Sequence, residues 1–225
     1  MFQDADHGAW EDYWIPPSCL DISGADIHIF SKSGRDSIGD RAGIHQAVRD
    51  SLQLGTTGCG IEKRCILEGE LLVWNSEVGR IEPFYKIRRH VQRAGRQIGT
   101  AGDSPIAVGE RLMIVLYNVM LLDDLVYAQQ SQDKRRDLLE QLVHRIPGQA
   151  EVGSRQVIRF SSTDAAESLR KAFSNAIAQR WEGLVLKVVM IPARHSARTQ
   201  RPTNSRKTTF PALATQPMSL SLNYL

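Results

Sequence analysis

The 225-residue sequence has few of the signals that mark secreted, membrane-spanning or metal-binding chains. Its three cysteines, Cys19, Cys59 and Cys65, lack C-x-x-C spacing, and their odd number favours a reducing compartment, the cytosol or nucleus. The N-terminal residues MFQDADHGAWEDYW are acidic and aromatic, unlike a secretory or mitochondrial leader. The longest apolar run, 112–122, is shorter than the ~20 residues needed to cross a bilayer.

Acidic residues are absent from the stretch 190–225, which holds five basic side chains and is rich in Ser, Thr and Pro. This composition predicts a disordered basic tail. Because the whole chain carries a net charge of +3, residues 1–189 carry a net charge of −2. The body is therefore not a generally basic nucleic-acid binder, and any such contact must come from local patches.

Lysine is missing before Lys32, and the segment around that residue, SKSG at 31–34, lacks the spacing of a phosphate-cradling P-loop. His28, His90 and His144 have no partner at metal-ligand spacing, so we assign them no role. These absences exclude two common routes to nucleotide or metal binding.

Strand-like and helix-like segments alternate along the body of the chain. Short apolar or alternating runs predict strands, and apolar residues at helical spacing predict helices. The predicted strands cover 27–31, 65–74, 112–122, 157–160 and 183–189, and the predicted helices cover 42–54, 80–96, 133–144 and 164–179. This order predicts an α+β, or mixed α/β, fold.

Two acidic side chains interrupt the apolar run RCILEGELLVWN at 64–75. Residues i and i+2 of a strand share a face, so Glu68 and Glu70 point the same way. Burying an unpaired carboxylate is costly. That face is therefore either solvated or packed against a positive group. A second strand, RWEGLVLK, begins near Glu182 and ends at Lys187.

Carboxylates from two distant strands can hold a divalent cation beside phosphates, and a lysine on one of those strands can contact a polyphosphate. The alternative is an exposed sheet edge with a surface ion pair, which contributes little stability. Spacing alone favours the exposed edge.

Six segments, taken in order, resemble the nucleotidyltransferase domain of eukaryotic ATP-dependent DNA ligases, and above all the fungal members related to the end-joining ligase. They are IHIFSKSGRDS, ILEGELLVWN, RIEPFYKIRRHV, LMIVLYNVMLLDD, DKRRDLLEQLV and WEGLVLK. The resemblance implies an ATP-grasp-like domain with antiparallel sheets flanked by helices. We expect a partial domain at 27–189, after a divergent segment at 1–26 and before the tail at 190–225.

The same resemblance implies a nucleotide and metal site. Glu70 would serve the metal and the ribose, and Glu182 would bind the metal. Lys187 would lie near the phosphates. Lys32 stands where the family has a basic residue that touches a nucleotide or DNA phosphate.

Tyr117 falls where an aromatic ring stacks on adenine, and Asn118 follows it where Asp is common. Without the resemblance, Tyr117 is typical of a core aromatic residue. A basic segment offers a DNA-backbone patch or, equally, a solvated helix face. It contains Lys86, Arg88, Arg89, Arg93 and Arg96. The cations at 134–136 favour a solvated role or pairing with acids.

The family's chemistry begins with a lysine in a K-x-D-G motif, which attacks the α-phosphate of ATP. No lysine of this chain begins K-x-D-G, and the stretch DYWIPPSCLDISGAD stands where the motif belongs. The fifth motif of paired lysines and the OB-fold domain are also missing from the sequence. We therefore expect a truncated or misassembled gene product that does not catalyse ligation as written. Loss of the first-motif strand would open the central sheet and lower solubility.

The sequence thus predicts an ATP-dependent DNA ligase domain of DNA repair and recombination, nuclear, using ATP and Mg²⁺ on nicked or broken DNA and making no membrane contact. The alternative is a non-catalytic module that binds nucleotide or DNA. An RNA-capping-type guanylyltransferase fits the segment IEPFYKIRRHV poorly.

Overall fold

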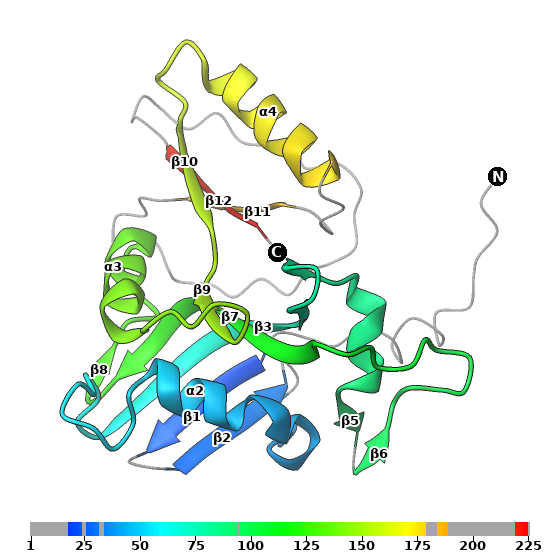
Figure 1. Cartoon of the computed structure of the whole chain (residues 1–225). Coiled ribbons are helices and arrows are strands. Elements are labelled where there is room, and N and C mark those ends of the chain that lie inside the picture. The colour runs from blue at the N-terminus through cyan, green and yellow to red at the C-terminus, as the bar shows by residue number, and fades with distance from the viewer. Residues whose placement is uncertain are drawn as a thin grey trace. The chain divides into compact units, whose positions relative to one another are not determined.

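The computed structural model describes residues 18–23, 26–31, 34–93, 95–178, 184–188 and 219–224 (Figure 1). It divides the chain into two compact units. Unit 1 lies within residues 1–128 and 135–153, and unit 2 lies within 129–134 and 154–225. Among the described residues, no helix combines the length and apolar character that crossing a bilayer requires.

Unit 1 is built on a mostly antiparallel sheet, with seven strands in the described part of the chain. Its main path runs β2 (Asp26–Ser31), β1 (Ser18–Ser23), β3 (Arg64–Asn75), β7 (Glu110–Leu122) and β8 (Leu125–Val126). Off this path, β4 (Arg80–Ile81) pairs with β3, and β9 (Ala150–Val152) runs parallel to β7. With its helices, this sheet confirms the mixed α/β class predicted from the sequence.

Short helices connect these strands. The segment predicted as one helix at 42–54 is a 3-10 helix, η1 (Gly39–Ile44), followed by α2 (His45–Ser51), which lies over the sheet (Figure 1). The helix α3 (Gln132–Leu142) lies within the range predicted for it, except at its first residue.

The basic segment 80–96 forms little helix, so that prediction is wrong for most of its length. It contains only the 3-10 helix η2 (Phe84–Arg89), after which the chain makes a hairpin of β5 (Gln92–Arg93) and β6 (Arg96–Gln97). Gly95, at the turn, has φ +76° and donates its N–H to Asp40 at 2.9 Å. A helix cannot continue through such a residue.

Strand β1 corrects a second expectation. The sequence predicted an open sheet edge before residue 27, but β1 pairs with β2 on one side and with β3 on the other along its whole length. Its residues Leu20 and Ile22 have no solvent exposure. The backbone groups expected to be unpaired are therefore satisfied, and the reason for expecting low solubility is removed.

Unit 2 has a three-stranded antiparallel sheet in its described residues, β10 (Arg155–Arg159), β12 (Ser219–Tyr224) and β11 (Leu184–Val188), with β12 in the middle. Helix α4 (Ala165–Ala178) buries Ala165 and Ala172 beside Ile158 of β10. Strand β12 lies inside the segment predicted to be a disordered tail. The sequence analysis therefore missed this strand.

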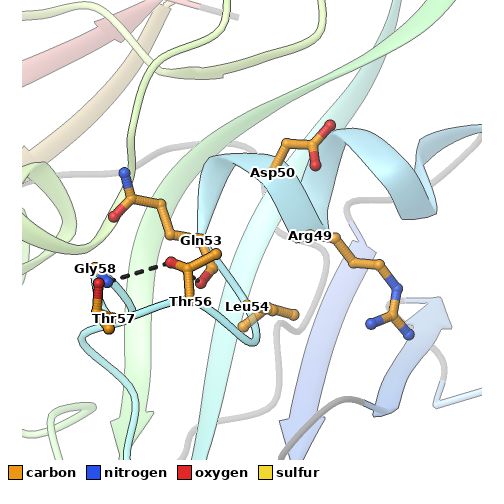
Figure 2. A pocket seen from close by; sticks show the side chains of 7 residues that line it. All are labelled: Arg49, Asp50, Gln53, Leu54, Thr56, Thr57 and Gly58. Atoms are coloured by element: carbon orange, nitrogen blue, oxygen red, sulfur yellow. Dashed lines mark hydrogen bonds between the residues drawn. The ribbon is translucent and has the colours of Figure 1, made fainter.

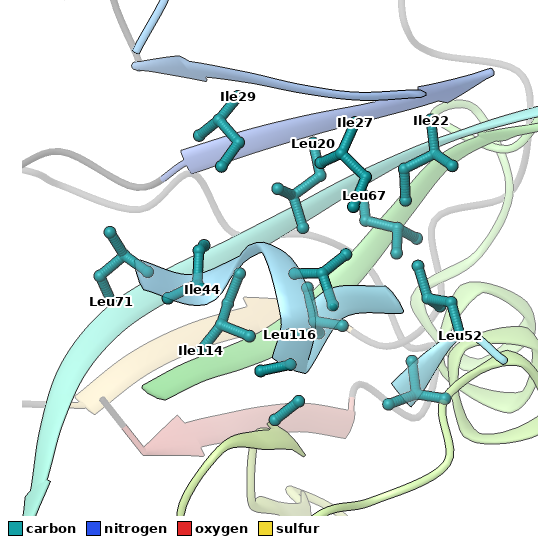
Figure 3. Packing of buried hydrophobic residues seen from close by; sticks show 14 of the residues in the cluster. Leu20, Ile22, Ile27, Ile29, Ile44, Leu52, Leu67, Leu71, Ile114 and Leu116 are labelled. Carbon is teal, nitrogen blue, oxygen red and sulfur yellow. The ribbon is translucent and has the colours of Figure 1, made fainter. Parts of the chain in front are cut away.

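The core of unit 1 lies on one face of the sheet, against η1 and α2 (Figure 3). Every second residue of β3, from Cys65 to Asn75, is buried, and the residues between them are half-buried or exposed. Apolar residues of the neighbouring strands and of the helices fill the space above. Figure 3 labels ten of them, including Leu20, Ile29, Ile44, Leu67 and Leu116. Burying one such side chain contributes about 1.5–3 kcal/mol.

A buried ionic cluster joins the far end of β3 to η2 and to the start of β7. Lys86 makes ion pairs with Glu82, at 3.1 Å, and with Glu110. Hydrogen bonding to Glu110 raises the pKa of Lys86. Burial opposes the ionisation of Glu110, but its bonds to Lys86 and to the Ala107 N–H leave the pKa of that carboxyl lowered. His90 lies 3.7 Å from Glu110, and burial lowers its pKa. Lys86, predicted to contact DNA, is thus engaged in ion pairs and has 21% side-chain exposure.

Gly69→Ala tests the close contact between β3 and β7. A Cβ at this position would lie 3.0 Å from Leu116 Cδ2 and 3.1 Å from Ile114 Cγ1. Overpacking a core costs about 1–3 kcal/mol, so we expect a loss of that size in the free energy of unfolding in urea. The control is Gly39→Ala, whose Cβ meets nothing within 4 Å and which we expect to be neutral. Equal effects of the two substitutions would contradict the packing described here.

Lys86→Met tests the ionic cluster. It would leave the carboxylates of Glu82 and Glu110 buried, with 7% and 2% side-chain exposure, and without their shared cation. Removing one partner of a buried ion pair costs about 3–5 kcal/mol, measurable by urea unfolding near neutral pH. Lys63→Met is the control, because Lys63 and its partner Asp124 are both exposed and such pairs contribute at most about 1 kcal/mol. A loss below about 1 kcal/mol for Lys86→Met would show that the cluster is not a structural element.

Candidate functional site

The two acids of β3 lie on the face of the strand that turns away from the core of unit 1. Gly69, between them, faces the core side chains of Ile114 and Leu116. Glu68 and Glu70 are half-buried on the opposite face. In the pattern E-G-E, the glycine has no side chain and lets Ile114 and Leu116 of β7 pack closely against β3. The two carboxylates lie on the other, partly open face of the strand.

Strand β7 reaches this face through two irregularities in its pairing with β3. Glu68 is paired with Asn118, whereas the next residue, Gly69, is paired with Leu116, so Tyr117 is an extra residue. A second shift skips Met120. Each β-bulge changes which side chains of β7 face the core. The bulges change the alternation only from Tyr117 onward, because residues 112–116 pair in regular register and are all buried.

Glu68 is bonded directly to Asn118 of β7 and is linked through it to α3. Asn118 Nδ2 donates a hydrogen bond to Glu68 Oε2 at 2.6 Å, and Arg135 Nη1 of α3 donates to Asn118 Oδ1 at 2.8 Å. Burial lowers the pKa of Arg135, and the negative charge of Glu68 opposes that effect. The sequence predicted that the cations at 134–136 are solvated or paired with acids. It did not connect Arg135 with Asn118.

Glu70 has a buried cation near it. Arg41 lies in η1, where its φ of −126° and ψ of 26° break the helix, and its side chain is almost wholly buried. Burial and the nearby charge of Arg35 lower the pKa of Arg41, whereas Asp40 and Glu70 raise it. Arg35 also pairs directly with Asp40 at 2.6 Å. The sequence left two possibilities for the acids of β3, a solvated face or a nearby positive group. Arg41, which the sequence analysis did not single out, is a cation close enough for the charge of Glu70 to raise its pKa.

Tyr117, predicted to stack on adenine, is half-buried beside Asn118 in the bulge of β7. A Cβ added at Gly153 would lie 3.7 Å from the Cβ of Tyr117, so the glycine leaves space beside the aromatic residue. The Gly153 N–H also donates to the Leu116 carbonyl at 2.8 Å. Tyr117 and Glu70 thus come from neighbouring strands of one sheet.

Other predicted site residues lie wholly or partly outside the described structure. Lys32 and Glu182 are outside the described residues, and Lys187 is described only by its backbone, within β11. The predicted pairing of Glu70 with Glu182 across a metal ion therefore stays a prediction. Within the described residues, no group of three His, Cys, Asp or Glu side chains is placed to hold a metal ion.

The predicted basic patch divides into two parts. Lys86 belongs to the buried cluster, Arg88 pairs with Asp103 at 3.2 Å, and Arg89 donates to backbone carbonyls of the following loop. Arg93 and Arg96 are exposed and lie opposite one another in the β5–β6 hairpin. Of these described residues, Arg93 and Arg96 are the exposed ones, and they lie on a hairpin and not on the helix face that the sequence analysis considered.

A depression of about 460 Å³ lies beside the end of α2 (Figure 2). Polar side chains dominate its lining, and a hydrogen bond of 3.2 Å from the Gly58 N–H to the Thr56 hydroxyl closes one side. Its lining residues are Arg49, Asp50, Gln53, Leu54, Thr56, Thr57 and Gly58. None of them is a predicted site residue.

Several known proteins are similar to this chain. DNA ligase 4 of Arabidopsis thaliana is 27% identical over 176 residues, which cover 73% of this chain and 13% of that protein. DNA ligase 4 of Dictyostelium discoideum is 24% identical over 164 residues, which cover 73% of this chain and 14% of that protein. The chain therefore spans only a small part of the length of these relatives.

Two solved structures are also similar, each 16% identical over 76% of this chain. They are mycobacterial DNA ligase D complexed with ATP and MES, with a TM-score of 0.47, and the ligase domain of M. tuberculosis DNA ligase D, with a TM-score of 0.45. The matches cover 45% and 44% of those chains.

The family model described as "ATP dependent DNA ligase domain" matches residues 18–201. This match begins at the first residue of β1 and is wider at both ends than the range 27–189 predicted from the sequence. It covers most of the chain, and the chain therefore belongs to the family of ATP-dependent DNA ligase domains.

Proposed function

We propose that this chain binds ATP at the partly open face of β3, between Glu70 and Tyr117, and that it acts on nicked or broken DNA in nuclear repair and recombination. One observation carries this proposal. Adjacent strands bring a half-buried carboxylate and a half-buried aromatic ring to the same part of the sheet. An aromatic ring supplies a flat apolar surface for a base, and a carboxylate supplies oxygen ligands for Mg²⁺.

The residues present fit ATP and Mg²⁺ in their chemistry. Glu70 would contribute an anionic oxygen to the metal and the ribose. The family resemblance proposes a metal-binding role for Glu182 and phosphate contacts for Lys32 and Lys187. Bound ATP would supply the adenylate group, and Mg²⁺ would offset the charge of its phosphates. The negative charge of Glu70 raises the pKa of the buried Arg41, although burial leaves that pKa lowered overall.

We do not expect the chain to form a covalent lysyl-adenylate. The sequence contains no K-x-D-G motif, and no lysine precedes Lys32. Removing the nucleophile from a covalent mechanism removes most of its rate enhancement. An unrelated binding module is not favoured, because the family match covers most of the chain.

The exposed hairpin is the part of the chain that we propose for DNA contact. Arg93 and Arg96 are exposed and occupy directly opposed positions of the hairpin. Guanidinium groups bind the phosphates of nucleic acid irrespective of sequence. The bond from Gly95 to Asp40 fixes the turn that carries both arginines.

Labelled ATP tests the proposed nucleotide site. We expect ATP, with Mg²⁺, to bind the native protein in a calorimetric titration. Tyr117→Ala should weaken binding about tenfold, because base–aromatic stacking contributes about 1–3 kcal/mol. After denaturation, no label from ATP carrying ³²P at its α-phosphate should stay on the protein.

Tyr85→Ala is the control for this titration, since Tyr85 is exposed in η2 and we assign it no role. Equal ATP affinity of wild type and Tyr117→Ala, or no binding by either, would disprove the proposed site. Label retained after denaturation would show instead that another lysine serves as nucleophile.

A salt titration tests the hairpin. The double substitution Arg93→Gln/Arg96→Gln should weaken binding to a nicked duplex and lower the slope of log K against log salt by about 1.8, or about 0.9 for each phosphate that the protein no longer neutralises. Fluorescence anisotropy with a labelled duplex gives both quantities. The matched control is Arg170→Gln/Lys171→Gln, which removes the same charge from an exposed part of α4. A slope changed equally by both double substitutions would mean that the hairpin has no special role.

A further inference from the structure

The side chain of Asn118 connects three elements of unit 1. It is 4% exposed, and it uses both ends of its amide. Its Nδ2 donates to Glu68 Oε2 of β3 at 2.6 Å, and its Oδ1 accepts from Arg135 Nη1 of α3 at 2.8 Å. The linkage Arg135–Asn118–Glu68 therefore runs from a helix through β7 to the neighbouring strand.

This linkage is placed at the bulge of β7. The pair Glu68–Asn118 is the last one in register before β7 inserts Tyr117, and pairing resumes at Gly69 and Leu116. A bulge locally disrupts the ladder between two strands, so side-chain bonds beside it contribute to how the bulged strand is held. Asn118 is the residue next to the ring and is bonded on both sides.

The chemistry at position 118 is specific for an amide. A carboxamide can donate to Glu68 and accept from Arg135 at the same time. An aspartate in the same place could still accept from Arg135, but it would bring two carboxylates together at 2.6 Å, the present distance between Asn118 Nδ2 and Glu68 Oε2. With the amide, the positive charge of Arg135 and the negative charge of Glu68 are joined through one neutral group.

We infer that Arg135, Asn118 and Glu68 are positioning residues that hold the bulge of β7 and so fix the ring of Tyr117. The use of the Tyr117 ring in binding adenine rests on the proposed function. The orientation of the ring by these three residues does not.

A polarity swap tests the linkage. Asn118→Asp removes the donor to Glu68, and adding Glu68→Gln restores a hydrogen bond in the opposite direction, from Gln Nε2 to Asp Oδ. Position 117 is labelled with 3-fluorotyrosine and followed by ¹⁹F NMR, and ATP affinity is measured by calorimetry. We expect Asn118→Asp to shift or broaden the ¹⁹F signal and to weaken ATP binding about tenfold, as coupled neighbours do. The double variant should regain the wild-type signal and an affinity within about twofold.

The control is Asn118→Asp combined with Glu77→Gln, which removes an equal charge at an exposed site and should not restore the ¹⁹F signal. A restored ¹⁹F signal in the double variant supports the inference, whether or not ATP binds. If neither the wild type nor any variant binds ATP, that result refutes only the proposed function. An unchanged ¹⁹F signal in Asn118→Asp overturns the inference. Failure of the double variant to fold or to recover the signal also overturns it.

Discussion

The pairing of β3 with β7 is the constraint on which unit 1 depends. The two strands run antiparallel from Cys65 and Leu122 to Asn75 and Glu110, and each also pairs with a further strand. One face of β3 is wholly buried, so its register cannot slip by a single residue without exposing the core and burying two acids. The two bulges in β7 shift its register with β3 and so change which of its side chains face the core. They bring Val119 and Leu122 back to the core after the position of Tyr117.

Charge on the open face is balanced by residues that are distant in the sequence. Glu68 is linked through Asn118 to Arg135 of α3. Glu70 interacts with the charge of Arg41, a buried residue with non-helical backbone angles in η1. The cluster around Lys86 follows the same rule at the other end of β3. A buried charge is tolerated only when it is paired and hydrogen-bonded. These contacts therefore connect the loops between strands to the sheet, as well as balancing its charge.

Local patterns in the sequence were sufficient to predict part of this arrangement. The long runs that became β3 and β7 were predicted within about two residues at each end. The i, i+2 relation placed Glu68 and Glu70 on one face. The strands β1 and β12 were missed because each is short and is formed by pairing between two neighbours rather than by its own pattern. The partners of Lys86 and Arg135 depend on tertiary contacts, which no local pattern contains.

The middle position of β12 constrains how the protein can fold during synthesis. Strands β10 and β11 are each bonded to β12 and not to one another, so their sheet cannot form before residue 224 has left the ribosome. Unit 1 contains no residue beyond 153, so all of its residues are synthesised before β10, β11 and β12. Until translation passes β12, the growing polypeptide carries two strands with open edges, which are sites where chaperones or other nascent chains can bind.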